Sequence, residues 1–117
     1  SLTPPLVLVC VVNGGEAGAA MNAAEHFAVN FLSDQQENLS RQFSSRVPDR
    51  YEGVPCKAGA SGAPLLDGCI GYLECRKTAA HVEGDHTIIV GEVLAAEAKD
   101  DGLPLLYFRS GYRKITG

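Results

Sequence analysis

The sequence lacks an excess of positive charge. Its 117 residues contain 10 Lys and Arg against 14 Asp and Glu, which gives a formal net charge of -4 and an isoelectric point near 5.2. The basic residues are scattered along the chain. Because a nucleic-acid-binding surface needs clustered Lys and Arg to contact phosphates, this class of protein is not expected.

Long apolar runs are also absent. The longest clean run is residues 6–12, whereas a membrane-spanning helix takes about 20 apolar residues. The sequence does not open on a basic region followed by the apolar core of a secretory leader, so we expect neither a membrane protein nor a secreted one.

Cysteines are few, and none forms a C-x-x-C pair. The common zinc and thioredoxin-like spacings are therefore missing. On one continuous strand Cys69 and Cys75 would lie about 20 Å apart, too far for a disulfide. We expect these two residues, together with Cys10 and Cys56, to be small buried side chains in a reducing cytoplasm.

Segments typical of β-strands dominate the sequence. The predicted strands are residues 6–12, 26–32, 69–81, 86–98 and 104–108, and a tight turn at 82–85 joins the two long ones. A short Ala-rich helix is predicted over 17–25. Because strands and helices do not alternate regularly, the pattern favours one mainly β domain, a small antiparallel barrel, over a doubly wound sheet.

A second helix is predicted from Ser33 to about residue 43 or 44. Ser33 can cap its first amides, and Gln36 three residues later completes a capping box. Residues 46–66 are rich in Pro and Gly and predict a long irregular connection.

Local catalytic and cofactor motifs are weak. The Gly14-Gly15-x-x-Gly18 cluster differs from the dinucleotide-binding fingerprint G-x-G-x-x-G, so we interpret it as a turn. Ser61 lacks the G-x-S-x-G context of a nucleophile elbow. No hydrolytic site is predicted.

Polar residues stand out at two places. Four titratable side chains lie in or next to the 82–85 turn, namely His81, Glu83, Asp85 and His86. Consecutive turn residues splay outward, so we expect no metal site there; His86 either lines a ligand site or caps a strand. Asn30 lies in an otherwise apolar strand and is either bonded to nearby backbone or presented to a polar ligand.

Several segments together resemble the flavin reductase-like family, the short-chain NAD(P)H:flavin oxidoreductases that serve two-component monooxygenases. The matching segments, in family order, are SLTPPLV (1–7), FAVNFLS (27–33) with Gln36 and Phe43, GAPLLDG (62–68), LEC (73–75), GDH (84–86), GEV (91–93) and PLLYFRSGY (104–112). They extend over nearly the whole chain.

The resemblance implies a split β-barrel that binds FMN or FAD, with one or two short helices. It implies a cytoplasmic homodimer in which NADH or NADPH reduces the flavin, and a partner monooxygenase that receives the reduced flavin. The family has strands and a phosphate-binding segment before its Ser-Leu-x-Pro-Pro motif. We therefore expect residues 1–117 to be one split-barrel domain that lacks the N-terminal strands of the family.

The resemblance also implies site residues. His86 and Tyr112 match positions on the nicotinamide side. The flavin-binding positions would be Ser1, Asn30, Leu32, Ser33, Gln36, Arg50 and Tyr51. Hydride transfer needs the nicotinamide stacked on the flavin, so the protein supplies orientation rather than an acid or a nucleophile.

Two other functions remain open. The chain could be a flavin-binding electron carrier without a nicotinamide site, or a truncated barrel that acts only as a structural or dimerisation module. The presence of both His86 and Tyr112 favours the reductase.

Overall fold

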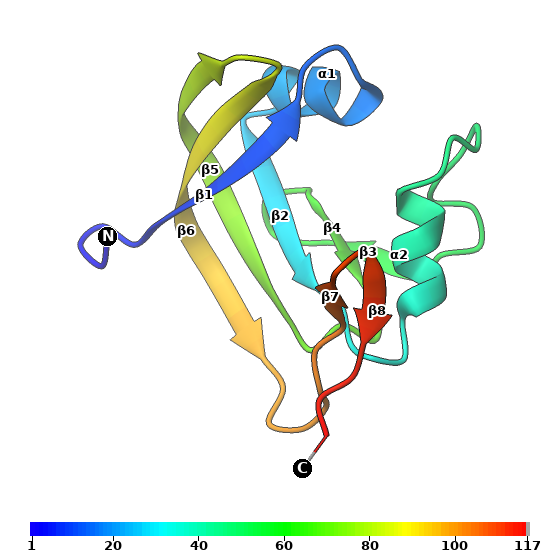
Figure 1. Ribbon diagram of the computed structural model, residues 1–117. Coiled ribbons are helices and arrows are strands. Elements are labelled where there is room, and N and C mark those ends of the chain that lie inside the picture. Colours follow the sequence, from blue (N-terminus) through cyan, green and yellow to red (C-terminus); the bar gives the residue numbers. More distant parts are fainter. Residues whose placement is uncertain (117) are drawn as a thin grey trace.

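A curled antiparallel sheet forms the centre of the protein. The computed structural model describes residues 1–116. Four strands make the sheet in the order β1-β6-β5-β2, and Figure 1 shows it curving around one side of the molecule. The strands are β1 (Leu6–Val12), β2 (His26–Phe31), β5 (Gly71–Glu83) and β6 (His86–Ala98).

Smaller elements lie against this sheet. Two short hairpins are formed by β3 (Cys56–Ala58) with β4 (Pro64–Leu66) and by β7 (Leu106–Phe108) with β8 (Gly111–Arg113). The helices are α1 (Glu16–Ala23) and α2 (Glu37–Phe43). In Figure 1, α1 lies above the sheet, while α2 and the β7–β8 hairpin lie beside the lower end of β2.

The core lies on the concave face of the sheet. Ile89 and Cys75 are completely buried, and Phe27 is 6% exposed. A side chain at Gly91 would overlap the Phe27 ring, so the glycine lets the aromatic ring lie directly against β6. These residues join β6, β5 and β2 into one packed unit.

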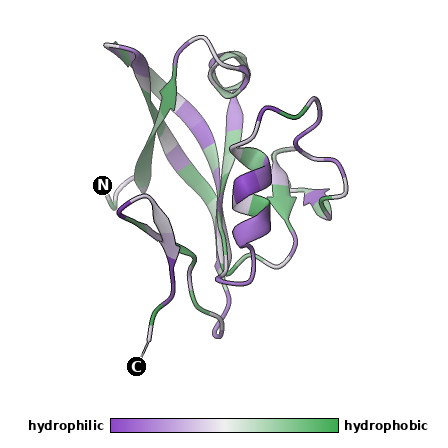
Figure 2. Ribbon diagram, turned by 45° about the vertical axis from the view of Figure 1, so that its right-hand side comes forward, coloured by the Kyte–Doolittle hydropathy of each residue, from purple (hydrophilic) through white to green (hydrophobic). Residues whose placement is uncertain are grey.

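The strand β1 has two different faces. Val7, Val9 and Val11 pack against the core, whereas Leu8 and Val12 are exposed. This alternation follows from the two-residue period of a strand. Because both faces carry apolar residues, Figure 2 shows β1 as an almost continuously hydrophobic strand.

The long β5–β6 hairpin gives the sheet its curvature. Its two-residue turn contains Gly84 at φ 62°, a left-handed conformation that suits glycine. The pairing shifts register between Glu74 and Cys75 and again between Lys77 and Ala79. Such bulges bend a strand and increase its twist, which converts the sheet into a half-barrel.

Most predicted elements are confirmed. The mainly β, antiparallel architecture is present, with two short helices. The first strand has the predicted bounds, and the two long strands form the predicted hairpin. The Gly14-Gly15 pair lies in the turn between β1 and α1, as interpreted from its spacing.

The start of the second helix was predicted four residues too early. The Gln36 side chain does accept a hydrogen bond from the Ser33 amide at 2.8 Å, as a capping box requires. However, the Gln36 amide bonds to the Ser33 carbonyl, which closes a turn, and α2 begins only at Glu37.

Other expectations were wrong. Residues 46–66 are not wholly irregular, because they contain β3 and β4; strands of three residues are too short to produce a recognisable alternation. The strand β8 was also missed. Cys10 and Cys56 are exposed rather than buried, although Cys69 and Cys75 are buried as expected. None of the four is in a disulfide.

Over residues 1–116, no helix is both long and apolar enough to cross a membrane.

Candidate functional site

A groove lies where the end of β2 meets α2 and the C-terminal hairpin. Its volume is about 460 Å³, within the usual range of small-molecule sites. We call it the tyrosine groove, and its lining residues are Asn30, Phe31, Leu32, Ser40, Ser44, Leu105, Tyr107 and Tyr112. Three of them, Asn30, Leu32 and Tyr112, are site residues predicted from the sequence.

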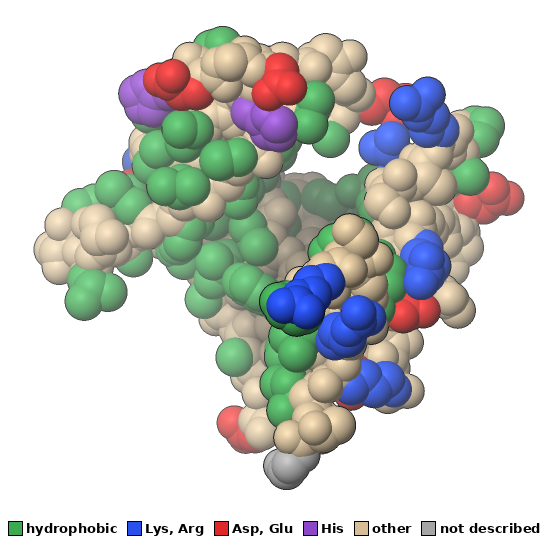
Figure 3. Space-filling model, viewed as in Figure 1, with side chains coloured by type: hydrophobic (Ala, Val, Ile, Leu, Met, Phe, Trp, Pro, Cys, Tyr) green, Lys and Arg blue, Asp and Glu red, His purple; other side chains and the backbone are tan. Residues whose placement is uncertain are grey.

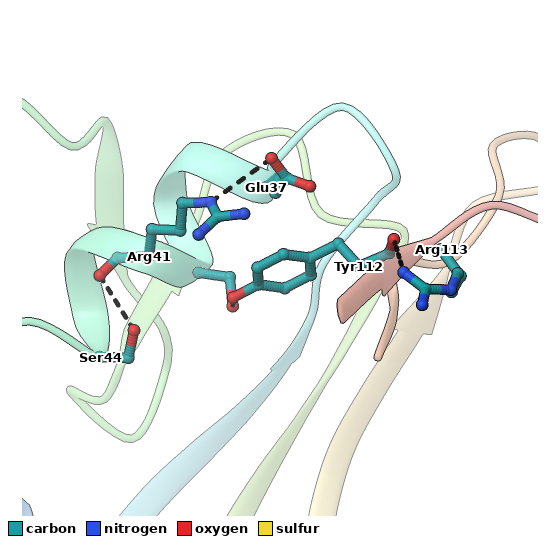
Figure 4. Close-up of polar contacts among 6 residues, drawn as sticks. Glu37, Arg41, Ser44, Tyr112 and Arg113 are labelled. Carbon is teal, nitrogen blue, oxygen red and sulfur yellow. Dashed lines mark hydrogen bonds and ion pairs between the residues drawn. The ribbon is translucent and has the colours of Figure 1, made fainter. Parts of the chain in front are cut away.

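Several contacts fix the orientation of Tyr112. Its hydroxyl lies 2.7 Å from the Ser40 hydroxyl on α2, and the Tyr107 ring meets its ring edge-on at 5.3 Å. The Arg41 guanidinium lies 4.8 Å from the Tyr112 ring centroid, a cation–π contact. Figure 4 shows the phenol pointing from β8 to α2, and Arg41 paired with Glu37.

Asn30 is bonded to backbone rather than left free for a ligand. Its amide nitrogen donates to the Pro64 carbonyl at 3.1 Å, and its amide oxygen accepts the Leu66 amide at 3.0 Å. Of the two roles that the sequence left open, the structure therefore assigns bonding to backbone. Asn30 attaches β4 to β2 and itself lines the groove.

Ser33 and Gln36 join the entry of α2 to the loop before β5. Gln36 accepts the Ser33 amide through its side-chain oxygen and donates from its nitrogen to the Asp67 carbonyl at 2.9 Å. Ser33 is buried. Both polar ends of the Gln36 amide are thus used within the protein, and neither Ser33 nor Gln36 lines the tyrosine groove.

A second hollow lies between α1, β2 and the start of β4. Its volume is about 490 Å³, and we call it the β4 hollow. Its lining residues are Ala20, Met21, Ala24, Glu25, His26, Phe27, Ala28, Tyr51, Ser61, Gly62, Ala63 and Pro64. Tyr51 is the predicted site residue among them.

The Arg50–Tyr51 pair lies near the end of α2. The Tyr51 ring meets Phe43 edge-on at 4.9 Å. Burial, with a smaller effect of Cys56, raises the pKa of the Tyr51 phenol, so it is neutral at physiological pH. Arg50 donates from Nε to the Ser45 carbonyl at 3.0 Å.

His86 lies at the first position of β6, beside the hairpin turn. Its Nδ1 is 2.7 Å from a carboxylate oxygen of Asp85, and this contact lowers the pKa of the Asp85 carboxyl. The hairpin tip lies at the top of Figure 1, whereas β8 lies lower down, next to α2. Within this chain, the structure therefore does not bring His86 and Tyr112 together at one mouth of the barrel.

Ser1 lies apart from both cavities. Its hydroxyl donates to the Pro4 carbonyl at 2.7 Å, and the residue is exposed. Leu32 is half-buried in the tyrosine groove, and its carbonyl accepts the Leu105 amide at 2.9 Å.

Sequence reasoning missed some lining residues. Tyr107 lies in the aromatic segment that was noted as a strand but was not assigned to the site. Ser40 lies on α2 and Ser44 directly follows its last residue, and no local pattern distinguishes them from other serines. Their role depends on where β8 packs.

Basic side chains gather on α2, on the loop after it and on the C-terminal segment. Figure 3 shows a hollow below α1 with hydrophobic side chains inside it, and Lys and Arg along its right-hand and lower edges. Six of the ten basic residues belong to α2, the loop after it and the C-terminal segment: Arg41, Arg46, Arg50, Arg109, Arg113 and Lys114. Apolar cavities with a cationic margin fit a flat aromatic ligand that carries phosphate.

The fold and the cavities define a ligand-binding antiparallel half-barrel. Residues 1–116 match the family model described as flavin reductase like domain. The chain therefore belongs to this family, which confirms the resemblance inferred from its motifs.

Two relatives show how far the similarity extends. The reductase subunit HsaB of a flavin-dependent monooxygenase from Mycobacterium tuberculosis is 33% identical over 117 residues, which cover 98% of this chain and 63% of HsaB. The FMN reductase (NADH) SmoA from Agrobacterium fabrum is 42% identical over 116 residues, 99% of this chain and 66% of SmoA. The chain thus spans less than two thirds of the HsaB length.

A solved structure has the same fold. The NADH:FAD oxidoreductase SgcE6 from Streptomyces globisporus, in complex with NAD and FAD fragments, superimposes with a TM-score of 0.94 and 35% identity. The comparison covers 99% of this chain and 71% of SgcE6. The predicted split-barrel fold is confirmed.

Replacing Asn30 by Asp should loosen β4. The new carboxylate still accepts the Leu66 amide, but it presents an oxygen to the Pro64 carbonyl where the amide donated. We expect the free energy of unfolding at pH 7 to fall by about 1–3 kcal/mol, measured by urea denaturation. The deficit relative to the wild type should shrink at acidic pH, because a protonated carboxyl can donate again. A deficit that does not change with pH would contradict the assigned role of Asn30.

Proposed function

We propose that the protein reduces FMN or FAD with NADH or NADPH and passes the reduced flavin to a partner monooxygenase. The observation that carries this proposal is the tyrosine groove, which collects Asn30, Leu32 and Tyr112 from two distant segments of a flavin reductase-like chain. The similarity to HsaB, which is named as the reductase subunit of a flavin-dependent monooxygenase, supports the same function.

The bound flavin would supply the redox chemistry by accepting a hydride from the nicotinamide. The protein would bind and orient both molecules. We assign Asn30, Leu32, Ser33 and Gln36 to the flavin side; Asn30 and Leu32 line the tyrosine groove, and Ser33 and Gln36 follow them in the chain. Ser1, Arg50 and Tyr51 are assigned to flavin binding by family position alone.

His86 and Tyr112 are assigned to the nicotinamide side. Neutral imidazole can donate or accept a hydrogen bond with a carboxamide, and a tyrosine ring can stack on an aromatic ring. Figure 3 shows a hollow below α1, and in Figure 1 the hairpin tip lies at the top and β8 lower down. An extended dinucleotide in this hollow could therefore meet residues from both ends.

We also propose that residues 1–117 are one domain that forms a homodimer. Leu8 and Val12 are 62% and 55% exposed on the outer face of β1, together with Cys10. On β6, Val90 and Ile88 pair with Leu8 and Cys10 and therefore extend the same face. Since β1 is also an edge strand, an apolar strip and an unpaired backbone edge occur together, which favours association. The free cysteines favour a cytoplasmic location, which cell fractionation would test.

The activity is tested by mixing the protein with NADH or NADPH and excess FMN or FAD. We expect the nicotinamide absorbance to fall over many turnovers per chain. A yellow protein without turnover would instead identify a flavin-binding electron carrier. A colourless, inactive protein would identify a structural or dimerisation module. Heat-denatured protein provides the control for non-enzymatic flavin reduction.

Replacing His86 by Ala should affect the nicotinamide substrate selectively. Losing one hydrogen bond of about 1 kcal/mol should raise the KM for NADH about fivefold and leave the KM for flavin almost unchanged. His81→Ala removes an exposed imidazole from the same hairpin and is the matched control. Equal increases in both KM values would argue against the nicotinamide role of His86.

Replacing Leu8 by Lys should separate the dimer. A charge in the centre of the apolar strip would have to be buried at the interface, so we expect a monomer in sedimentation velocity. Val47→Lys changes an exposed apolar residue in the loop after α2 and should leave the dimer intact. A Leu8→Lys protein that remains dimeric would place the interface elsewhere.

A further inference from the structure

A buried carboxylate on β5 has no assigned function. Glu74 is 4% exposed. Its partners across the sheet are Ala28 on β2 and Ala95 on β6, whose small side chains leave space for it. Burying a carboxylate is unfavourable unless hydrogen bonds replace its hydration. The groups that donate hydrogen bonds to the Glu74 carboxylate therefore indicate which segment it holds in place.

Those groups come from the turn between β3 and β4. The Ser61 hydroxyl donates to Glu74 Oε1 at 2.7 Å, and the Ser61 amide donates to the same oxygen at 3.1 Å. These bonds lower the pKa of the Glu74 carboxyl, with smaller contributions from the Ala60 amide and from His26, although burial opposes them.

The backbone of the turn lies directly against the carboxylate. A side chain at Gly59 would overlap the oxygens of Glu74. Within the turn, the Gly62 amide donates to the Gly59 carbonyl at 2.9 Å, and the Gly59 amide donates to the Ala63 carbonyl at 2.9 Å. The turn therefore folds around the carboxylate as a compact unit.

The β3–β4 hairpin needs such an anchor. Each of its strands has three residues, and an isolated two-stranded hairpin is marginally stable in water. Two side chains of the main sheet hold it: Asn30 bonds to β4, and Glu74 bonds to the turn. Residues 61–64 of this hairpin form one wall of the β4 hollow, where Tyr51 also lies.

We propose that Glu74 is a positioning residue that holds the 59–62 turn against the sheet and thereby sets the wall of the β4 hollow beside Tyr51, a residue assigned above to flavin binding. Glu74 does not line that hollow, so it acts through Ser61. The flavin part of this proposal rests on the proposed function, whereas the anchoring of the turn does not.

The anchoring is tested by amide hydrogen exchange in Glu74→Gln. Glutamine keeps the size of the side chain but turns one of the two acceptor oxygens into a donor. We expect the amides of residues 60–62 to exchange about tenfold faster or more, because their local opening costs less free energy. Ser61→Ala should accelerate exchange at the same amides, and Ser61→Thr, which keeps the hydroxyl, should restore the wild-type rate.

Glu92→Gln is the matched control. Glu92 is a carboxylate on the neighbouring strand β6, and it pairs with Arg76 at 2.7 Å near the surface. Its replacement removes the same charge without touching the turn. Exchange at residues 60–62 should therefore remain as in the wild type.

The positioning role is tested by flavin titration and steady-state kinetics. We expect Glu74→Gln to raise the flavin Kd and the KM for flavin about tenfold, equivalent to about 1.4 kcal/mol, while kcat at saturating flavin stays close to the wild-type value. A raised KM for flavin with an almost unchanged kcat indicates a displaced wall of the cavity rather than the loss of a reacting group.

The outcomes distinguish the anchoring of the turn from its effect on flavin binding. Unchanged exchange at residues 60–62 in a folded Glu74→Gln protein would overturn the anchoring. Faster exchange with an unchanged flavin Kd would overturn the positioning role. If the wild-type protein binds neither FMN nor FAD, the proposed function and the flavin role of Glu74 fail together, and the exchange rates still decide the anchoring.

Discussion

The antiparallel pairing of β5 with β6 is the interaction on which the rest of the structure depends. Each strand has 13 residues, and each pairs with a second strand on its other side, β2 and β1 respectively. Bulges in this pair bend the sheet. Without the curvature, β2 and the C-terminal hairpin would not enclose a groove.

Side-chain hydrogen bonds hold the walls of the two cavities together, in addition to backbone bonds such as that from the Leu105 amide to the Leu32 carbonyl. Asn30 bonds to β4, Glu74 to the turn before it, and Tyr112 to Ser40 on α2. Each bond joins residues at least 13 positions apart in the chain. The cavities therefore depend on a few long-range polar contacts, whose loss leaves buried partners unsatisfied.

Prediction from the sequence succeeded where local periodicity is strong. The apolar run 6–12 became β1 with the expected bounds, and Gly84-Asp85 became the hairpin turn. It failed for β3, β4 and β8, whose three residues carry no usable period. Family motifs pointed to Asn30 and Tyr112 as separate site residues, but they did not reveal that both line one groove or that the Asn30 amide bonds to β4.

The sequence by itself determined the mainly β architecture, the long hairpin and the family, because these follow from residue type and order along the chain. Only the tertiary structure decided which side chains meet. His86 and Tyr112 belong to opposite ends of the half-barrel, while Asn30, Ser40 and Tyr112 converge. The reason is physical: strand period and turn chemistry act between near neighbours, whereas a cavity is formed by contacts between distant segments that depend on the curvature and register of the whole sheet.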